Sequence, residues 1–259
     1  MDKRLRKLSL VALAAALLQA TTMSAGAADP NASAVRPGET IPLTVFPSQV
    51  FLRVANDPQE ILWERVPEYQ VELVAAPVVH HSIALRKSSA GAPMPLYFSI
   101  ASDGERLYVK LRWRDATRDH ETGMARSRDG AAVQFAMRPG EQTSHMMGAP
   151  NRPVNIWYWR PDGDRAENLG AGGFGSATIL PDQPVSARSH YGTARVAHDN
   201  QWTVVLSRPL AAGGEHDARF EPGAVHAMAF AVWQGDLDQR DGLKRTTAGW
   251  INVDFSSLQ

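Results

Sequence analysis

The stretch RLYVKLRW (residues 106–113) decides the fold class, because apolar and polar side chains alternate along it. In an extended strand, successive side chains point to opposite faces. The apolar face of this strand carries Leu107, Val109, Leu111 and Trp113. The other face carries Lys110, which we expect to be solvated. One side of the strand is therefore predicted to face a core and the other to face water.

Nine further segments have a similar character. They are short, rich in β-branched and aromatic residues, and bounded by Gly, Pro, Asp or Asn. These segments are residues 66–76, 80–87, 95–102, 131–137, 154–160, 194–199, 201–209, 227–235 and 248–255. Such spacing is typical of a sandwich or barrel. We predict an all-β fold, an antiparallel β-sandwich with a few short helices and long loops. The Gly-rich residues 162–192 are predicted to be a long polar connection, and this segment and the extended arm at residues 29–39 are expected to be free enough to wrap a partner.

The first 27 residues have the order of an export signal. A basic segment, MDKRLRK, is followed by the apolar segment LSLVALAAALLQA, which is too short to span a bilayer, and by the cleavage pattern Ala25-Gly26-Ala27. We therefore predict a signal peptide over residues 1–27, an extended arm over 28–44 and one domain over 45–259. The product is expected to be exported and soluble, with no membrane span.

The composition excludes several classes of partner and site. Lys and Arg together number 27, as do Asp and Glu, so no net charge attracts nucleic acid or an anionic membrane. Cysteine is absent, which excludes disulfides, covalent c-type haem attachment and Cys-ligated zinc or iron–sulfur clusters. No hydrolase or phosphate-binding motif is present. Any redox centre must be held non-covalently.

Two distant tracts offer a thioether and an amine as possible ligands of one metal. They are HMMGAPNRPVNIWYWR (145–160) and AFAVWQGDLDQRDGLKRTTAGW (229–250). Lysine is scarce, with five among the 27 basic residues, yet Lys244 stands between two β-like runs. Unlike arginine, lysine can lose its proton and donate a lone pair. From the residues alone, Met147 can equally be a core residue and Lys244 an exposed loop charge.

The order of several strings resembles the ethylbenzene-dehydrogenase-type haem-binding family. The strings are AAVQFAM, MGAPNRPVNIWYWR, QWTVVLSRPL, and AFAVWQGD followed by QRDGLK and GW. This family includes gamma subunits of periplasmic molybdenum enzymes such as ethylbenzene and dimethylsulfide dehydrogenases and chlorate and selenate reductases. The similarity spans residues 45–259, and the M-G-x-P-x-x-P-V-x-I-W-x-W motif with the downstream R-x-G-x-K motif is its specific part.

The resemblance implies one non-covalent b-type haem per chain, with a methionine and a lysine as axial ligands. Carried over by motif, these are Met147, which directly precedes Gly148, and Lys244. Met146 and His145 remain alternatives to Met147. Trp157, Trp159, Trp233 and Trp250 are expected to wall the cofactor. With both axial positions filled, the chain is expected to transfer electrons and not to be an enzyme by itself.

The resemblance also implies partners and a location. It predicts a periplasmic heterotrimer with a molybdopterin-containing alpha subunit and an iron–sulfur beta subunit, which exchanges electrons with a soluble cytochrome or similar carrier. The alternative function is a secreted β-sandwich module that binds carbohydrate on an aromatic platform and carries no haem. The neighbouring His80 and His81 are expected to be one core and one surface residue, because strand neighbours point to opposite faces. The acidic residues around 236–241 are interpreted as a turn, not as a calcium site.

Overall fold

The computed structural model describes residues 29, 31–46, 56–84, 91–123, 126–163, 165–193 and 199–258. The expected signal peptide lies outside these residues. The strands are β1 (Ser33–Ala34), β2 (Thr40–Pro42), β3 (Thr44–Val45), β4 (Tyr69–Ala75), β5 (Met94–Ser102), β6 (Arg106–Arg114), β7 (Gly130–Ala136), β8 (Val154–Arg160), β9 (Arg165–Ala171), β10 (Thr178–Ile179), β11 (Ser186–Thr193), β12 (Asn200–Pro209), β13 (Val225–Trp233), β14 (Arg245–Thr247) and β15 (Ile251–Asp254). The short helices are η1 (Ile61–Arg65), α1 (His81–Ala84) and η3 (Gly235–Leu237).

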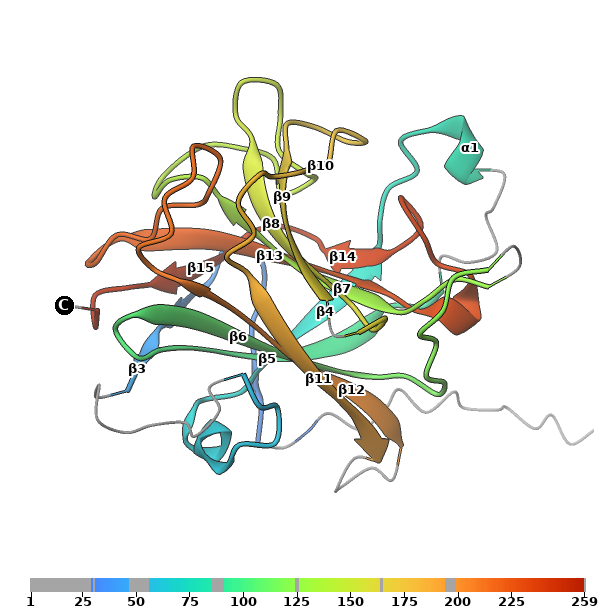
Figure 1. Ribbon diagram of the computed structural model, residues 1–259, viewed down its shortest axis with the longest axis horizontal. Helices are drawn as coiled ribbons and strands as arrows, with labels where there is room; N and C mark the ends of the chain where they lie inside the picture. The colour runs from blue at the N-terminus through green and yellow to red at the C-terminus, as the bar shows by residue number, and fades with distance from the viewer. Residues whose placement is uncertain are drawn as a thin grey trace, which may run out of the picture.

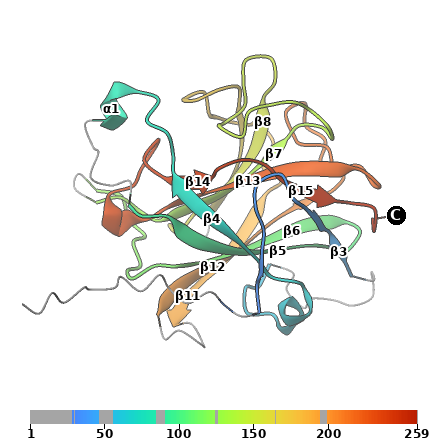
Figure 2. The same ribbon diagram turned by 180° about the vertical axis from the view of Figure 1, so that it is seen from behind.

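The strands form one long, mostly antiparallel sheet that curls into a sandwich-like fold, as predicted (Figure 1). Its order is β10-β9-β8-β7-β13-β14-β4-β5-β6-β12-β11. Strands β7, β8, β9 and β13 form one half, and β4, β5, β6, β11 and β12 form the other. Seen from behind, β14 and β4 lie side by side where the two halves meet (Figure 2).

Aromatic side chains fill the space between the two halves of the sheet. Trp159 of β8 packs against Trp113 of β6 and Trp202 of β12, with ring centroids 6.0 and 4.9 Å apart. Phe98 of β5 meets Phe230 of β13 at 4.7 Å. These contacts join strands from opposite halves, so the core lies where the alternation in residues 106–113 places it.

The N-terminal arm pairs with the sheet of the same chain. Strand β1 pairs in parallel with β4, β2 with β15, and β3 with β5. The backbone of residues 33–45 is therefore largely committed to intramolecular hydrogen bonds, so the expectation that the arm is free to wrap a partner is wrong. In the described part of the chain, no helix is long and apolar enough to cross a bilayer.

Two segments differ from the secondary structure predicted. Residues 162–192 are not one irregular connection, because they contain β9, β10 and most of β11. The glycine and polar residues of this segment hid the alternation of apolar and polar side chains by which a strand is predicted. Residues 80–87 were expected to form a strand, but residues 81–84 form the single turn of α1. Both His80 and His81 are exposed and their rings lie 4.4 Å apart, so the expectation of one core histidine is wrong.

Lys110 also differs from its expected environment. The alternation in β6 is present, but the second face of the strand is covered by residues around η1. The amine of Lys110 lies 5.5 Å from the centroid of the Trp63 ring, and burial lowers its pKa. The side chain is therefore half-buried and not fully solvated.

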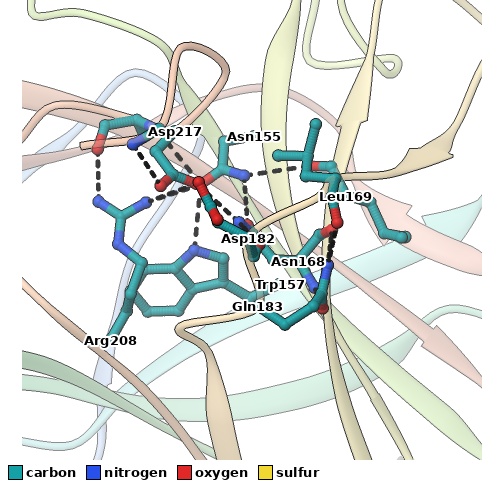
Figure 3. Close-up of polar contacts among 11 residues, drawn as sticks. Asn155, Trp157, Asn168, Leu169, Asp182, Gln183, Arg208 and Asp217 are labelled. Carbon is teal, nitrogen blue, oxygen red and sulfur yellow. Dashed lines mark hydrogen bonds and ion pairs between the residues drawn. The ribbon is translucent and has the colours of Figure 1, made fainter. Parts of the chain in front are cut away.

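A buried polar network ties β8, β9 and β12 together (Figure 3). Arg208 donates to Asn155 Oδ1 at 3.0 Å and lies 3.6 Å from Asp217 Oδ1. Asn168 donates to the same carboxylate oxygen at 2.6 Å and accepts from Asn155 at 2.7 Å. Asn155 and Asn168 are fully buried. Side chains alternate along a strand, so the network holds the inner faces of β8 and β9 together. The side chains on the outer faces of these two strands take no part in it.

Candidate functional site

A cavity of about 1020 Å³ lies on the outer face of β7, β8 and β13. Its floor is set by the alternation of these strands. Residues such as Val133 and Phe230 belong to the core, whereas Ala132 and Ala231, which are paired across β7 and β13, carry only methyl groups on the cavity side. Ile156 of β8 continues the floor. Small side chains on neighbouring strands leave a flat apolar surface, which suits a planar ligand.

The walls of the cavity come from loops that lie far apart in the sequence. One wall is the loop between β7 and β8, another is the loop between β13 and β14, and a third is the loop between β9 and β10. The segment before and within α1 contributes His80 and Ile83. The segment before β7 contributes Thr122, Ser127 and Arg128. The other three loops contribute His145, Met146, Met147, Phe174, Gly175, Ala177, Gln239, Arg240, Asp241, Gly242, Leu243 and Lys244.

The structure brings Met147 and Lys244 into contact in this cavity. The Nζ atom of Lys244 donates to the Sδ atom of Met147 at 3.7 Å, although 97 positions separate them. Lys244 is 8% exposed, and Met147 is half-buried. A thioether is a weak hydrogen-bond acceptor. A buried amine is thus held beside a soft sulfur atom, and both side chains are unbranched.

The backbone of the Met147 loop is unusual. Met147 has φ 66°, in the left-handed region that non-glycine residues rarely occupy, and Gly148 follows with φ 78°. A Cβ atom on Gly148 would lie 2.8 Å from the carbonyl oxygen of Ala171. The Met147 carbonyl accepts from Gly173 N at 2.8 Å. These contacts hold the methionine over the cavity floor and explain why glycine follows it.

The Lys244 loop is held from several sides. The Lys244 carbonyl accepts from Ala76 N at 2.9 Å, which ties the loop to the end of β4. The indole nitrogen of Trp233 donates to the carbonyl of Asp241 at 3.1 Å. A Cβ atom on Gly242 would lie 2.3 Å from Ile83 Cδ1, so the glycine lets the Ile83 side chain pack directly on the loop. The loop therefore presents the lysine at a fixed place.

Burial lowers the pKa of the Lys244 amine to about 8, although the nearby carboxylate of Asp241 opposes the shift. Desolvation disfavours the charged form of an amine. The neutral amine, which is the form that can donate a lone pair to a metal, therefore becomes as abundant as the ammonium form near pH 8 instead of only in strongly alkaline solution.

The two alternatives to Met147 also line the cavity. Burial lowers the pKa of the His145 imidazole, and the His145 carbonyl accepts from Gln134 Nε2 at 3.0 Å. Met146 lies beside it, with its backbone N–H donating to Ser144 Oγ. Within the described residues, only Met147 places a sulfur atom at hydrogen-bond distance from the Lys244 amine.

The four tryptophans that were expected to wall the site divide into two groups. Trp157 and Trp159 are fully buried in the core, because they alternate with the cavity-facing Ile156 and Tyr158 on β8. Their expected role is therefore wrong. Trp233 lines the cavity, and Trp250 packs into the apolar cluster beneath it.

Several cavity residues were missed by the sequence analysis. The alanines of the floor, Tyr158, Arg128 and Arg240 all contribute to the lining. A signal for the floor existed, since alanine recurs at every second position in AMAFA (227–231). The arginines had no comparable signal, because they lie among 22 similar residues.

Comparison with known proteins identifies close relatives. A model of the family described as ethylbenzene dehydrogenase matches residues 171–245. The gamma subunit of dimethylsulfide dehydrogenase from Rhodovulum sulfidophilum is 47% identical over 90% of this chain and 86% of its own. The gamma subunit of chlorate reductase from Ideonella dechloratans is 35% identical over 78% of this chain and 80% of its own. A haem subunit assigned to a respiratory nitrate reductase of Haloferax mediterranei is 32% identical over 82% and 77%.

Solved structures show a more distant similarity. A protein of Bacteroides uniformis described as carbohydrate-binding gives a TM-score of 0.48 at 9% identity, covering 84% of this chain and 99% of that chain. A family 9 carbohydrate-binding module from Caldicellulosiruptor kristjanssonii gives 0.45 at 10% identity, covering 83% and 95%. Similarity of this degree says nothing about a ligand.

Proposed function

This chain belongs to the family that contains the gamma subunits of dimethylsulfide dehydrogenase and chlorate reductase, and we propose that it is a haem-binding electron-transfer subunit of a molybdenum enzyme. The observation that carries the proposal is the contact between Met147 Sδ and Lys244 Nζ inside a large apolar cavity. One haem b would be held there non-covalently, with these two residues as axial ligands.

The chemistry of the cavity fits this cofactor. The donor set combines a soft thioether with an amine whose pKa is lowered by burial. The alanine floor offers a flat surface to one face of a porphyrin, and Leu169, Trp233 and Phe174 add apolar area around it. When bound, haem supplies a one-electron redox couple. The protein excludes water and fixes the two donor atoms.

Two protein ligands on one iron leave no position for a substrate. The chain by itself is therefore proposed to transfer electrons and not to catalyse the substrate reaction. Methionine ligation stabilises the ferrous state and raises the reduction potential. With haem bound, Met147 and Lys244 would hold a centre that could exchange single electrons with an iron–sulfur cluster of a partner subunit.

The proposed partners follow from the family. The relatives named as gamma subunits imply further subunits, and we propose an alpha subunit with molybdopterin and a beta subunit with iron–sulfur clusters, in a periplasmic heterotrimer. A soluble cytochrome or similar carrier would exchange electrons with the complex. The leader-like residues 1–27 support export.

Visible absorption spectroscopy of the full chain from haem-replete cells tests cofactor binding. We expect a Soret band, sharp α and β bands after reduction by dithionite, and haem that acid–acetone extracts. A colourless protein would refute the proposal and favour a binding module without haem. Native mass spectrometry of the endogenous protein tests assembly. A complex with two larger subunits that contains molybdenum is expected, whereas a monomer or homo-oligomer without molybdenum would refute the subunit assignment.

A further inference from the structure

Arg240 lines the cavity and has a buried Nε–H group for which the structure shows no acceptor among the residues it describes. In the described part of the chain, a few buried side-chain nitrogen and oxygen atoms have no hydrogen-bond partner. Among these atoms, only Arg240 Nε belongs to a residue that lines the cavity. Buried donors in native proteins nearly always have an acceptor. The guanidinium of Arg240, a residue that lines the cavity, therefore has hydrogen-bonding capacity that no acceptor in the described part of the chain is seen to use.

A second cavity-lining arginine comes from a loop at the same end of the sheet. Arg128 lies two residues before β7, and Arg240 lies in the loop that follows β13; the register pairs Gly130 at the start of β7 with Trp233 at the end of β13. The two loops are also bonded to each other. Ser127 Oγ donates to Asp238 Oδ1 at 2.7 Å, and Gly235 N donates to Asp129 Oδ1 at 2.8 Å.

Arg128 has two side-chain partners. Its Nη1 atom lies 3.4 Å from Asp162 Oδ2, which is a long contact on a partly exposed side chain, and its guanidinium also forms a hydrogen bond with the Tyr158 side chain. A guanidinium carries five N–H groups in a planar fork, and this fork matches a carboxylate. The cavity is thus apolar over its floor, has an amine and a thioether on its walls, and presents two guanidinium groups at one end.

We infer that Arg240, together with Arg128, binds the propionate carboxylates of the haem. This inference rests on the proposed function, which places haem in the cavity. A haem has an apolar ring and two carboxylates on one edge, so a cavity with an apolar floor and two guanidinium groups at one end matches its asymmetry. The arginines then fix the in-plane orientation of the ring, while Met147 and Lys244 hold the iron.

The test compares two forms of the cofactor on the apo form of the full chain. Ferric protoporphyrin IX has free propionates, whereas its dimethyl ester has none. We expect Arg240→Gln to weaken binding of the free acid by on the order of ten- to a hundredfold, the loss typical of a hydrogen bond to a charged group. Binding of the ester should be unchanged. Arg219→Gln, an exposed arginine away from the cavity, is the matched control and should change neither affinity.

Further variants separate this inference from a general loss of structure. Arg240→Lys keeps the charge but loses the planar fork, so an intermediate affinity for the free acid is expected. Arg128→Gln should have a smaller effect than Arg240→Gln, because Asp162 already competes for its guanidinium. Equal weakening of acid and ester by Arg240→Gln, or no weakening of either, would overturn the inference. Failure of the unsubstituted chain to bind either form would overturn the proposed function itself, and this inference with it.

Discussion

The amine of Lys244 lies 4.8 Å from the centroid of the Trp233 indole ring, and Trp233 packs edge-on against Tyr158. The Tyr158 and Trp233 centroids are 5.3 Å apart, with the ring planes inclined by 70°. Two aromatic rings from neighbouring regions of the sheet thus form a rigid support behind the lysine. This support packs against the same amine that donates to Met147 Sδ.

Removal of either proposed axial ligand should change the haem spectrum. Lys244→Ala and Met147→Ala are each expected to abolish the low-spin spectrum or sharply reduce haem occupancy, because each removes one of two axial bonds. Lys110→Ala is a matched control, since Lys110 also lies over a tryptophan and has a pKa lowered by burial, but it lies outside the cavity. Unchanged low-spin spectra in Lys244→Ala would remove this lysine from the site. Loss of the bands in His145→Ala instead of Met147→Ala would identify the histidine as the ligand.

The alanine floor should control access of a planar cofactor. Ala231→Leu adds three carbon atoms on the cavity side of β13, where they occupy space that a porphyrin needs. We expect strongly reduced haem occupancy with little loss of thermal stability, because the added atoms enter a cavity and not the packed core. Ala211→Leu on an exposed turn is the control. Normal haem content in Ala231→Leu, measured by acid–acetone extraction, would contradict a ligand on this floor.

The glycine after Met147 should be irreplaceable for two reasons. In Gly148→Ala, the new Cβ would lie 2.8 Å from the Ala171 carbonyl oxygen on a backbone with positive φ. Strain of this kind costs about 1–3 kcal/mol and should displace Met147, so both the melting temperature and the haem spectrum should change. Gly140→Ala also has positive φ but meets no atom within 4 Å, so it should cost less and leave the spectrum intact. Identical behaviour of the two variants would show that the close approach is unimportant.

The buried ion pair between Arg208 and Asp217 should contribute strongly to stability. Asp217→Asn leaves the buried guanidinium without its counter-charge and is expected to destabilise the fold by about 3–5 kcal/mol. Asp199→Asn removes the partner of Arg114 in an exposed pair, which should cost less than about 1 kcal/mol. Chemical denaturation of both variants measures the difference. Comparable small effects would mean that the network in Figure 3 is not a stabilising unit.

Two buried carboxyl groups should make the fold less stable at alkaline pH. Burial, with mutual repulsion, raises the pKa of Asp115 to about 8, and burial raises that of Asp129 to about 6. Between the unfolded value of 3.8 and these values, the folded state binds more protons than the unfolded state. The free energy of unfolding therefore falls as pH rises, by about 1.4 kcal/mol per pH unit for each group. Thermal unfolding between pH 4.5 and 8.5 should show a shallower decline in Asp115→Asn, and parallel profiles would contradict the assignment.

Residues in regular alternation determined the fold class by themselves. The period of two in RLYVKLRW placed Trp113 and its neighbours in the core, and strands β4 to β8, β12, β13 and β15 lie where such segments were predicted. The strands that were missed, such as β9 and β11, contain polar residues and glycine on both faces. They are strands because their neighbours provide hydrogen-bond partners, which is a property of the sheet and not of the segment.

The sequence also singled out Met147 and Lys244. Met147 was chosen because it precedes the glycine of the family motif, and Lys244 because lysine is scarce in the sequence. The sequence did not show that the two side chains meet. Their contact depends on the pairing of β7 with β13. This pairing brings Lys244 Nζ within 3.7 Å of Met147 Sδ, although 97 positions separate the two residues. The same pairing decided which tryptophans face the core and which face the cavity, and it placed Arg128 and Arg240 at one end of the sheet. Side-chain type and period are local properties that a sequence displays, whereas strand pairing and loop placement depend on the whole fold, so only the tertiary structure could assemble the site.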